Sequence, residues 1–125
     1  MRTEIRYIEN KGTGEAWIGY CQFSKSGRSV YFNNKVFKRA QGISGNHIDI
    51  ETGEVYWISG IKKNGADRHW TDSGHIFLDI SAKDDYLRII SSSAFPKNKF
   101  ILVELVNTPN KKLSKQIENA KTEDP

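Results

Sequence analysis

Apolar and polar residues alternate along much of the first half of the chain, which predicts short β-strands joined by turns. Ile5 and Tyr7 alternate with charged residues in a first strand from Glu4 to Glu9. The segment Ala16–Phe23 carries apolar residues on both faces, as a central strand does. Gly19 lies inside this segment and predicts a bulge or a bend there.

The most clearly specified hairpin joins Ser29–Phe32 to Lys35–Lys38 through Asn33-Asn34. Asparagine tolerates positive φ angles, so these two residues predict a type I′ turn. The resulting register directs three side chains into the core, namely Val30, Phe32 and Phe37. The opposite face is only half apolar and carries Ser29, Tyr31, Val36 and Lys38.

The same register places Arg28 directly opposite Arg39. Like charges directly opposed in a sheet are destabilising unless an anion lies between them. The alternative is that the hairpin has splayed apart at this point and that both guanidinium groups lie in water.

Later segments continue the β pattern. A second hairpin is predicted over 46–59, with a glycine-bearing turn at Glu51–Gly53, and further strands are predicted over His75–Ile80 and Lys99–Val106. Between those strands, Ser81 predicts the N-cap of a short helix that continues to about Ile90.

These elements predict a mainly β, β-rich α+β fold: a small antiparallel, partly open β-barrel, SH3-like or OB-like, with one short helix and a C-terminal strand and tail. Residues 1–106 are expected to form a single domain. Residues 107–125 are expected to be a marginal helix or a flexible tail, because only Leu113 and Ile117 offer an apolar stripe.

Composition narrows the class of protein. A hydrophobic fraction of 37% with three Trp, five Tyr and six Phe is too apolar for a disordered chain. The N-terminus has no apolar signal region, and the longest apolar run, Phe100–Val103, is too short to span a bilayer. Cys21 is the only cysteine, which fits a reducing compartment. We therefore expect a cytoplasmic protein with no membrane partner.

Charge is distributed unevenly, although the formal net charge is only +4. The stretch from Ala16 to Ile48 contains no acidic residue. Such a stretch favours a nucleic-acid interface, in which cations follow phosphates and aromatic faces stack on bases. The candidate residues are Lys25, Arg28, Tyr31, Lys35, Lys38 and Arg39. The alternative is a solvated face that keeps the protein soluble.

A second group of reactive side chains lies between residues 62 and 75. His69 and His75 would be the base and acid of a metal-independent ribonuclease, with Arg68 and Lys63 as cations, if the histidines converge across a loop. The alternative is a polar loop with ordinary surface histidines. No metal-ligand spacing and no glycine-rich phosphate loop is present, so neither a metal nor a cofactor is expected.

Residue types that anchor protein interfaces are also present. Trp70, Arg68 and Tyr56 are candidates for such a surface, whereas Trp57 is expected to pack in the core.

Several segments resemble a group of short, uncharacterised bacterial proteins, some of which carry the name 1-deoxy-D-xylulose-5-phosphate synthase. The resemblance covers roughly residues 5–90 and is carried by Tyr7–Lys11, residues 18–25 and, most distinctively, Asp49–Arg68. That synthase is a multidomain thiamine-diphosphate enzyme with a Gly-Asp-Gly motif, which this sequence lacks. The resemblance therefore implies a bacterial cytoplasmic setting and no catalytic residue.

Together these features predict a small non-enzymatic binding module that contacts an anionic partner, most simply RNA or single-stranded DNA. The alternative is a protein-interaction module, such as an immunity protein or an accessory subunit. The third hypothesis is the compact ribonuclease.

Overall fold

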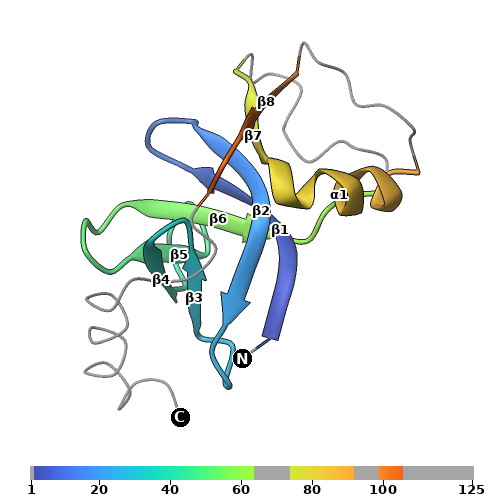
Figure 1. Cartoon of the computed structure of the whole chain (residues 1–125). Helices are drawn as coiled ribbons and strands as arrows, with labels where there is room; N and C mark the ends of the chain where they lie inside the picture. The colour runs from blue at the N-terminus through green and yellow to red at the C-terminus, as the bar shows by residue number, and fades with distance from the viewer. Residues whose placement is uncertain (1, 64–73, 92–98, 106–125) are drawn as a thin grey trace.

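Six strands close into a small antiparallel barrel (Figure 1). The computed structural model describes residues 2–63, 74–91 and 99–105. The barrel strands are β1 (Arg2–Asn10), β2 (Ala16–Phe23), β3 (Ser29–Phe32), β4 (Lys35–Arg39), β5 (His47–Asp49) and β6 (Val55–Ser59). Each strand pairs with the next, and β1 closes the ring by pairing with both β2 and β6. The predicted small β-barrel is confirmed; it is closed where a partly open barrel was expected, and its sequential order lacks the Greek-key crossing of an OB-like fold.

Two further strands extend the sheet from β2 in parallel. β7 (Ile76–Asp79) pairs with β2, and β8 (Phe100–Val103) pairs with β7. The antiparallel pairing predicted for the barrel does not extend to these two strands. Parallel neighbours need a crossover, and the chain between them includes the 3-10 turn η1 (Ile80–Ala82) and the helix α1 (Lys83–Ile89). Alternation of side chains carries no information about strand direction.

The β3–β4 hairpin has the predicted turn and register. Asn33 and Asn34 have φ angles of 48° and 62°, as a type I′ turn requires, and Val30 lies opposite Phe37.

β2 changes partners in its middle, at Gly19. Residues Ala16–Ile18 pair with β7, whereas Gln22 and Phe23 pair with β3. The register with β1 continues unbroken through Gly19, so the strand bends without a bulge. A Cβ at this position would lie 3.0 Å from the Phe32 ring, so glycine is what lets β3 approach here.

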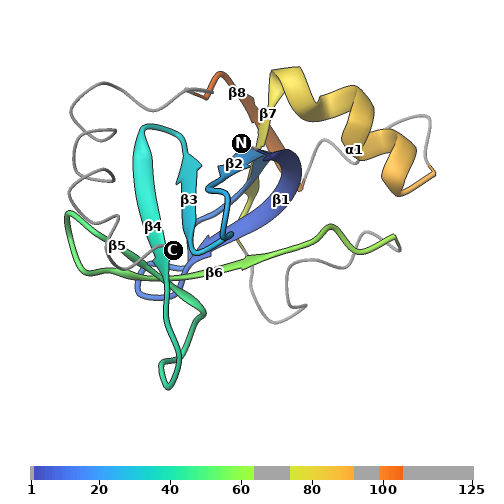
Figure 2. The same ribbon diagram turned by 90° about the horizontal axis from the view of Figure 1, so that it is seen from below.

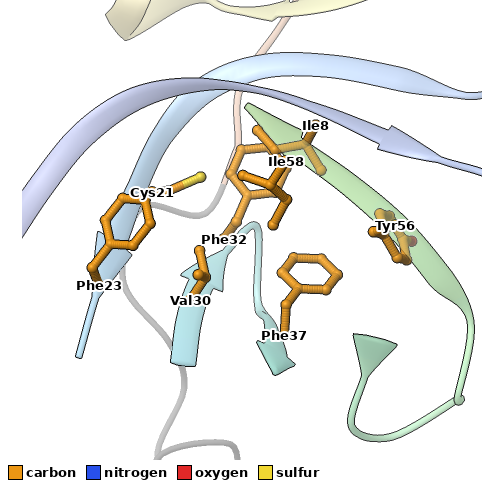
Figure 3. Packing of buried hydrophobic residues seen from close by; sticks show 8 residues of the cluster. All are labelled: Ile8, Cys21, Phe23, Val30, Phe32, Phe37, Tyr56 and Ile58. Carbon is orange, nitrogen blue, oxygen red and sulfur yellow. The ribbon is translucent and has the colours of Figure 1, made fainter. Parts of the chain in front are cut away.

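Apolar side chains form two main clusters on opposite sides of β1 and β2. The barrel interior holds Ile8, Cys21, Phe23, Val30, Phe32, Phe37, Tyr56 and Ile58 (Figure 3). The second cluster lies outside the barrel and holds Tyr7, Ala16, Ile18, Ile76, Leu78, Tyr86 and Phe100. Both faces of β2 are therefore buried, as predicted for a central strand.

The helix begins differently from the prediction. Asp79, not Ser81, supplies the cap: its carboxylate accepts a hydrogen bond from the Ser81 amide at 3.1 Å and starts the 3-10 turn that leads into α1. Ser91, with φ of 56°, follows the end of the helix. None of the helices in the described ranges is long and apolar enough to cross a membrane. The predicted tail, 107–125, lies outside those ranges.

Candidate nucleic-acid interface

One end of the barrel is ringed by arginines. Alternate residues of each strand face the interior, and Ile8, Val30 and Phe37 all do so. Arg2 and Arg6 share the inward face of β1 with Ile8. Arg28 lies two residues before Val30, and Arg39 lies two residues after Phe37. Both therefore lie at the same end of the hairpin. Figure 1 shows the N-terminus beside the β2–β3 turn, at this end. We call the four residues Arg2, Arg6, Arg28 and Arg39 the basic mouth.

Two of these arginines lie over the aromatic side chain of Phe23. The guanidinium carbons of Arg2 and Arg6 are 4.7 and 5.2 Å from the centre of the Phe23 ring. Both donate to the same oxygen of Glu4, Oε2, at 2.8 and 2.7 Å. One carboxylate thus serves two guanidinium groups, and a positive charge is left over at this side of the mouth.

The other two arginines face each other across the β3–β4 hairpin. The Arg39 amide donates to the Arg28 carbonyl at 2.9 Å, so the backbone is still paired there and the hairpin has not splayed apart. Both side chains are exposed. The predicted register, with Arg28 directly opposite Arg39, is therefore confirmed.

His47 lies next to Arg39 on the neighbouring strand β5 and is buried. Burial, and then the positive charge of Arg39, lower the pKa of His47 to about 4. Its Nδ1 is 2.7 Å from the Asn46 side-chain oxygen. The ring is therefore neutral at pH 7, and the charge of the mouth comes from the arginines.

This burial makes stability depend on pH. The folded state favours the neutral ring of His47, so its contribution is complete above pH 6.5 and is lost as the pH falls toward 4. At pH 5 the loss amounts to about 2 kcal/mol. Urea unfolding at pH 7.5 and pH 5 should show this additional loss in the native chain but not in His47→Gln. Parallel pH dependence in the two proteins would contradict it.

The predicted basic residues do not all gather at the mouth. Lys25 is exposed in the adjoining β2–β3 turn, and Lys38 is half-buried on the outer face of β4. Lys35 lies at the opposite end of the barrel, where its ammonium group is 3.7 Å from an Asp49 oxygen. Lys35 is therefore separated from Arg28 and Arg39 by the length of β4.

The predicted stacking residue is not available on the surface. Tyr31 is only 7% exposed and packs with Val36 and Ile50 on the outer side of the β3–β4 hairpin. Phe23, the aromatic side chain at the mouth, is buried beneath Arg2 and Arg6. Stacking on bases is therefore not what this end of the barrel offers.

The far end of the barrel has a different character. A shallow depression open to solvent is lined by Trp17, Phe32, Asn33, Lys35, Phe37 and Tyr56. Burial, together with the nearby charges of Glu54, Asp49 and Glu15, raises the pKa of the Tyr56 hydroxyl. The far end of the barrel is thus lined mainly by aromatic side chains, with Lys35 and several carboxylates close by.

Of the three candidates for a protein interface, the structure describes only Tyr56. Tyr56 is 2% exposed, with its ring 4.6 Å from that of Phe37, so it is a core residue. Trp57, expected in the core, is 42% exposed because its neighbours in β6 face inward. Arg68 and Trp70 lie outside the described residues.

The ribonuclease hypothesis rests on residues that the structure describes only in part. His75 and Lys63 are exposed, whereas His69 and Arg68 lie outside the described ranges. Within those ranges no three His, Cys, Asp or Glu side chains gather as metal ligands. Burial raises the pKa of the Cys21 thiol to about 12, so it stays protonated and is no nucleophile.

Sequence reasoning missed Arg2 and Arg6, because both lie outside the acid-free stretch. The signal was their spacing: Arg2, Glu4 and Arg6 share one face of a strand whose other face carries Ile5 and Tyr7. Guanidinium groups bind phosphate through paired hydrogen bonds, so a ring of them is suited to anions of that kind. No family model, no curated protein and no solved structure matches this chain.

Proposed function

We propose that the chain is a non-enzymatic binding module whose basic mouth contacts the phosphates of RNA or single-stranded DNA. The observation that carries the proposal is that the strand register places four arginines at one end of the barrel, where Glu4 is the one acid on the inward faces of the described strands. Lys25 extends the positive charge into the adjoining turn.

A single strand suits this geometry better than a duplex. The cations lie around the end of a narrow barrel, and a flexible strand can bend to bring its phosphates to them, whereas a rigid duplex cannot. Because the mouth lacks an exposed aromatic face among the described residues, affinity should come from phosphates and depend little on base identity.

Binding should fall steeply with salt, and Arg39 should contribute to that slope. Each phosphate contact with a single strand contributes about 0.7 to the slope of log K against log salt, so Arg39→Ala should lower the slope by roughly that amount. It should also weaken binding about fivefold at low salt. Fluorescence anisotropy of a mixed-sequence oligonucleotide of about 12 nucleotides measures both quantities.

Lys11→Ala is the matched control. It removes one positive charge at the far end of the barrel, where Lys11 pairs with Glu9 at 3.0 Å. Its slope should equal that of the native chain. Absence of binding at low salt, or an equal loss in both variants, would overturn the proposal, and tighter binding of a duplex of the same length would overturn its single-strand part. Cleavage of the oligonucleotide would favour the ribonuclease instead.

A protein-interaction module is the second candidate, and the exposure of Trp57 favours it. The residue is 42% exposed on the outer face of β6, beside Glu9 of β1. Tryptophan is enriched among residues that dominate interface energies. Recovery of a stoichiometric partner protein with the native chain, but not with Trp57→Ala, would support this function.

A further inference from the structure

The cations of the basic mouth are arranged as a ring and not as a row. They come from β1, from the turn before β3 and from β4, which lie at different points around a closed six-stranded barrel. A protein that follows a nucleic-acid backbone presents its cations along a groove, one phosphate after another. Cations placed around one barrel end can instead act together on one ligand group.

The inner part of this ring is fixed by packing. The Arg6 side chain is only 25% exposed, donates to the Ile5 carbonyl at 2.9 Å and shares Glu4 Oε2 with Arg2. Stacking of Arg2 and Arg6 over Phe23 further restricts the two guanidinium groups. Their position is therefore largely set before any ligand arrives, which lowers the entropic cost of binding.

The charge of the ring exceeds what one backbone phosphate can neutralise. Among the described residues, Arg2, Arg6 and Arg39 bring three positive charges to this end against the one carboxylate of Glu4. His47 is neutral at pH 7. A phosphate within a strand carries one negative charge and offers two free oxygens. A terminal phosphate monoester carries close to two charges and offers three oxygens.

We propose that the basic mouth is a receptor for a terminal phosphate monoester, so that the chain binds a nucleic acid by its phosphorylated end. This inference rests on the proposed function and specifies the part of the nucleic acid that is recognised. The phosphate lies over the Arg2 and Arg6 guanidinium groups, with Arg39 opposite, and the rest of the strand leads away past Lys25. No bond is made or broken.

The test compares oligonucleotides that differ only at one end. The probe is a mixed-sequence single strand labelled at its 3′ end, with either a 5′-phosphate or a 5′-hydroxyl group. The 5′-phosphate should bind about tenfold more tightly to the native chain, because it adds charge and a third oxygen where the guanidinium groups converge. The same preference should hold for a 3′-phosphate on a 5′-labelled strand, since the recognised chemistry is the same.

Three variants distinguish recognition by the arginines of the basic mouth from a general effect of positive charge. Arg39→Ala should reduce the preference for the phosphorylated end to less than twofold, and Arg6→Lys, which keeps the charge but loses the paired donors, should reduce it as well. Lys11→Ala should keep the full tenfold preference. Thermal unfolding of each variant shows that it is folded before binding is measured.

The possible outcomes distinguish failure of this inference from failure of the proposed function. Equal affinity for phosphate and hydroxyl ends would overturn this inference while leaving the proposed function intact, and no binding of either strand would overturn both. A 5′-mononucleotide that binds as tightly as the phosphorylated strand would overturn the inference as well, because the ligand would then be a small phosphate monoester and not a nucleic-acid end.

Discussion

Replacing Gly45 by alanine is expected to lower the free energy of unfolding by about 3 kcal/mol, the upper range for forcing an atom into a packed site. Gly45 lies in the connection between β4 and β5, which projects below the strands in Figure 2. A Cβ there would lie 2.2 Å from the Tyr56 carbonyl oxygen and 2.8 Å from its carbon. These are backbone atoms of β6, so no side-chain rotation can relieve the overlap.

Gly60→Ala provides the control for this prediction. Gly60 follows β6 directly, its φ angle is not in the left-handed region, and a Cβ would meet nothing within 4 Å. The free energy of unfolding of Gly60→Ala should stay within about 0.5 kcal/mol of that of the native chain. Urea denaturation of both variants measures the difference. A Gly45→Ala protein as stable as Gly60→Ala would show that the β4–β5 connection does not lie against β6 as described.

Asn46→Ala is expected to cost about 3 kcal/mol as well, because two partly buried backbone groups lose their partner. The Asn46 side chain makes the two hydrogen bonds to Ile58 that the backbone of a neighbouring strand would otherwise make. Its amide nitrogen donates to the Ile58 carbonyl at 2.8 Å, and its oxygen accepts from the Ile58 amide at 2.8 Å. The same oxygen lies 2.7 Å from His47 Nδ1. The residue therefore joins β6 to the strand that carries the histidine of the mouth.

The exposed neighbour Ser44 offers a matched control in the same connection. Ser44→Ala should change stability by less than about 0.5 kcal/mol. The stability of Asn46→Asp should lie between those of Asn46→Ala and Ser44→Ala. The aspartate retains the acceptor for the Ile58 amide and loses the donor to the Ile58 carbonyl. Equal stability of Asn46→Ala and Ser44→Ala in urea would remove the structural role assigned to Asn46.

Features encoded by neighbouring residues could be predicted from the sequence. The β3–β4 register followed from Asn33 and Asn34, whose positive φ angles fix a two-residue turn, and the opposition of Arg28 and Arg39 followed from that register. The parallel pairing of β7 and β8 could not be predicted, because alternating side chains look the same in both strand directions.

The site was predicted in part, for similar reasons. The acid-free stretch pointed to Arg28 and Arg39, but barrel closure was needed to bring Arg2 and Arg6 to the same end. Lys35 does not belong to the basic mouth, because it lies at the other end of β4, where it pairs with Asp49. Residue type alone predicts that Trp57 lies in the core. In the structure Tyr56 and Ile58 face the barrel interior, so Trp57 between them faces outward. A linear stretch of charge does not contain this information.

The two ends of the barrel differ in charge, which would favour the basic mouth as the place where the proposed ligand binds. Long-range attraction would steer a strand toward the arginines and away from the end that carries Asp49 and Glu54. Orientation of the ligand would then follow from charge alone, before any specific contact forms.

Two-dimensional amide NMR of the native chain, titrated with a mixed-sequence single-stranded oligonucleotide, tests the central claim most directly. Binding at the basic mouth predicts that the amide signals of Arg6, Phe23, Arg39 and His47 shift in a saturable manner, while those of the turn at residues 50–54, at the far end, do not. Shifts concentrated at the far end or around Trp57, or no shifts at low salt, would contradict it.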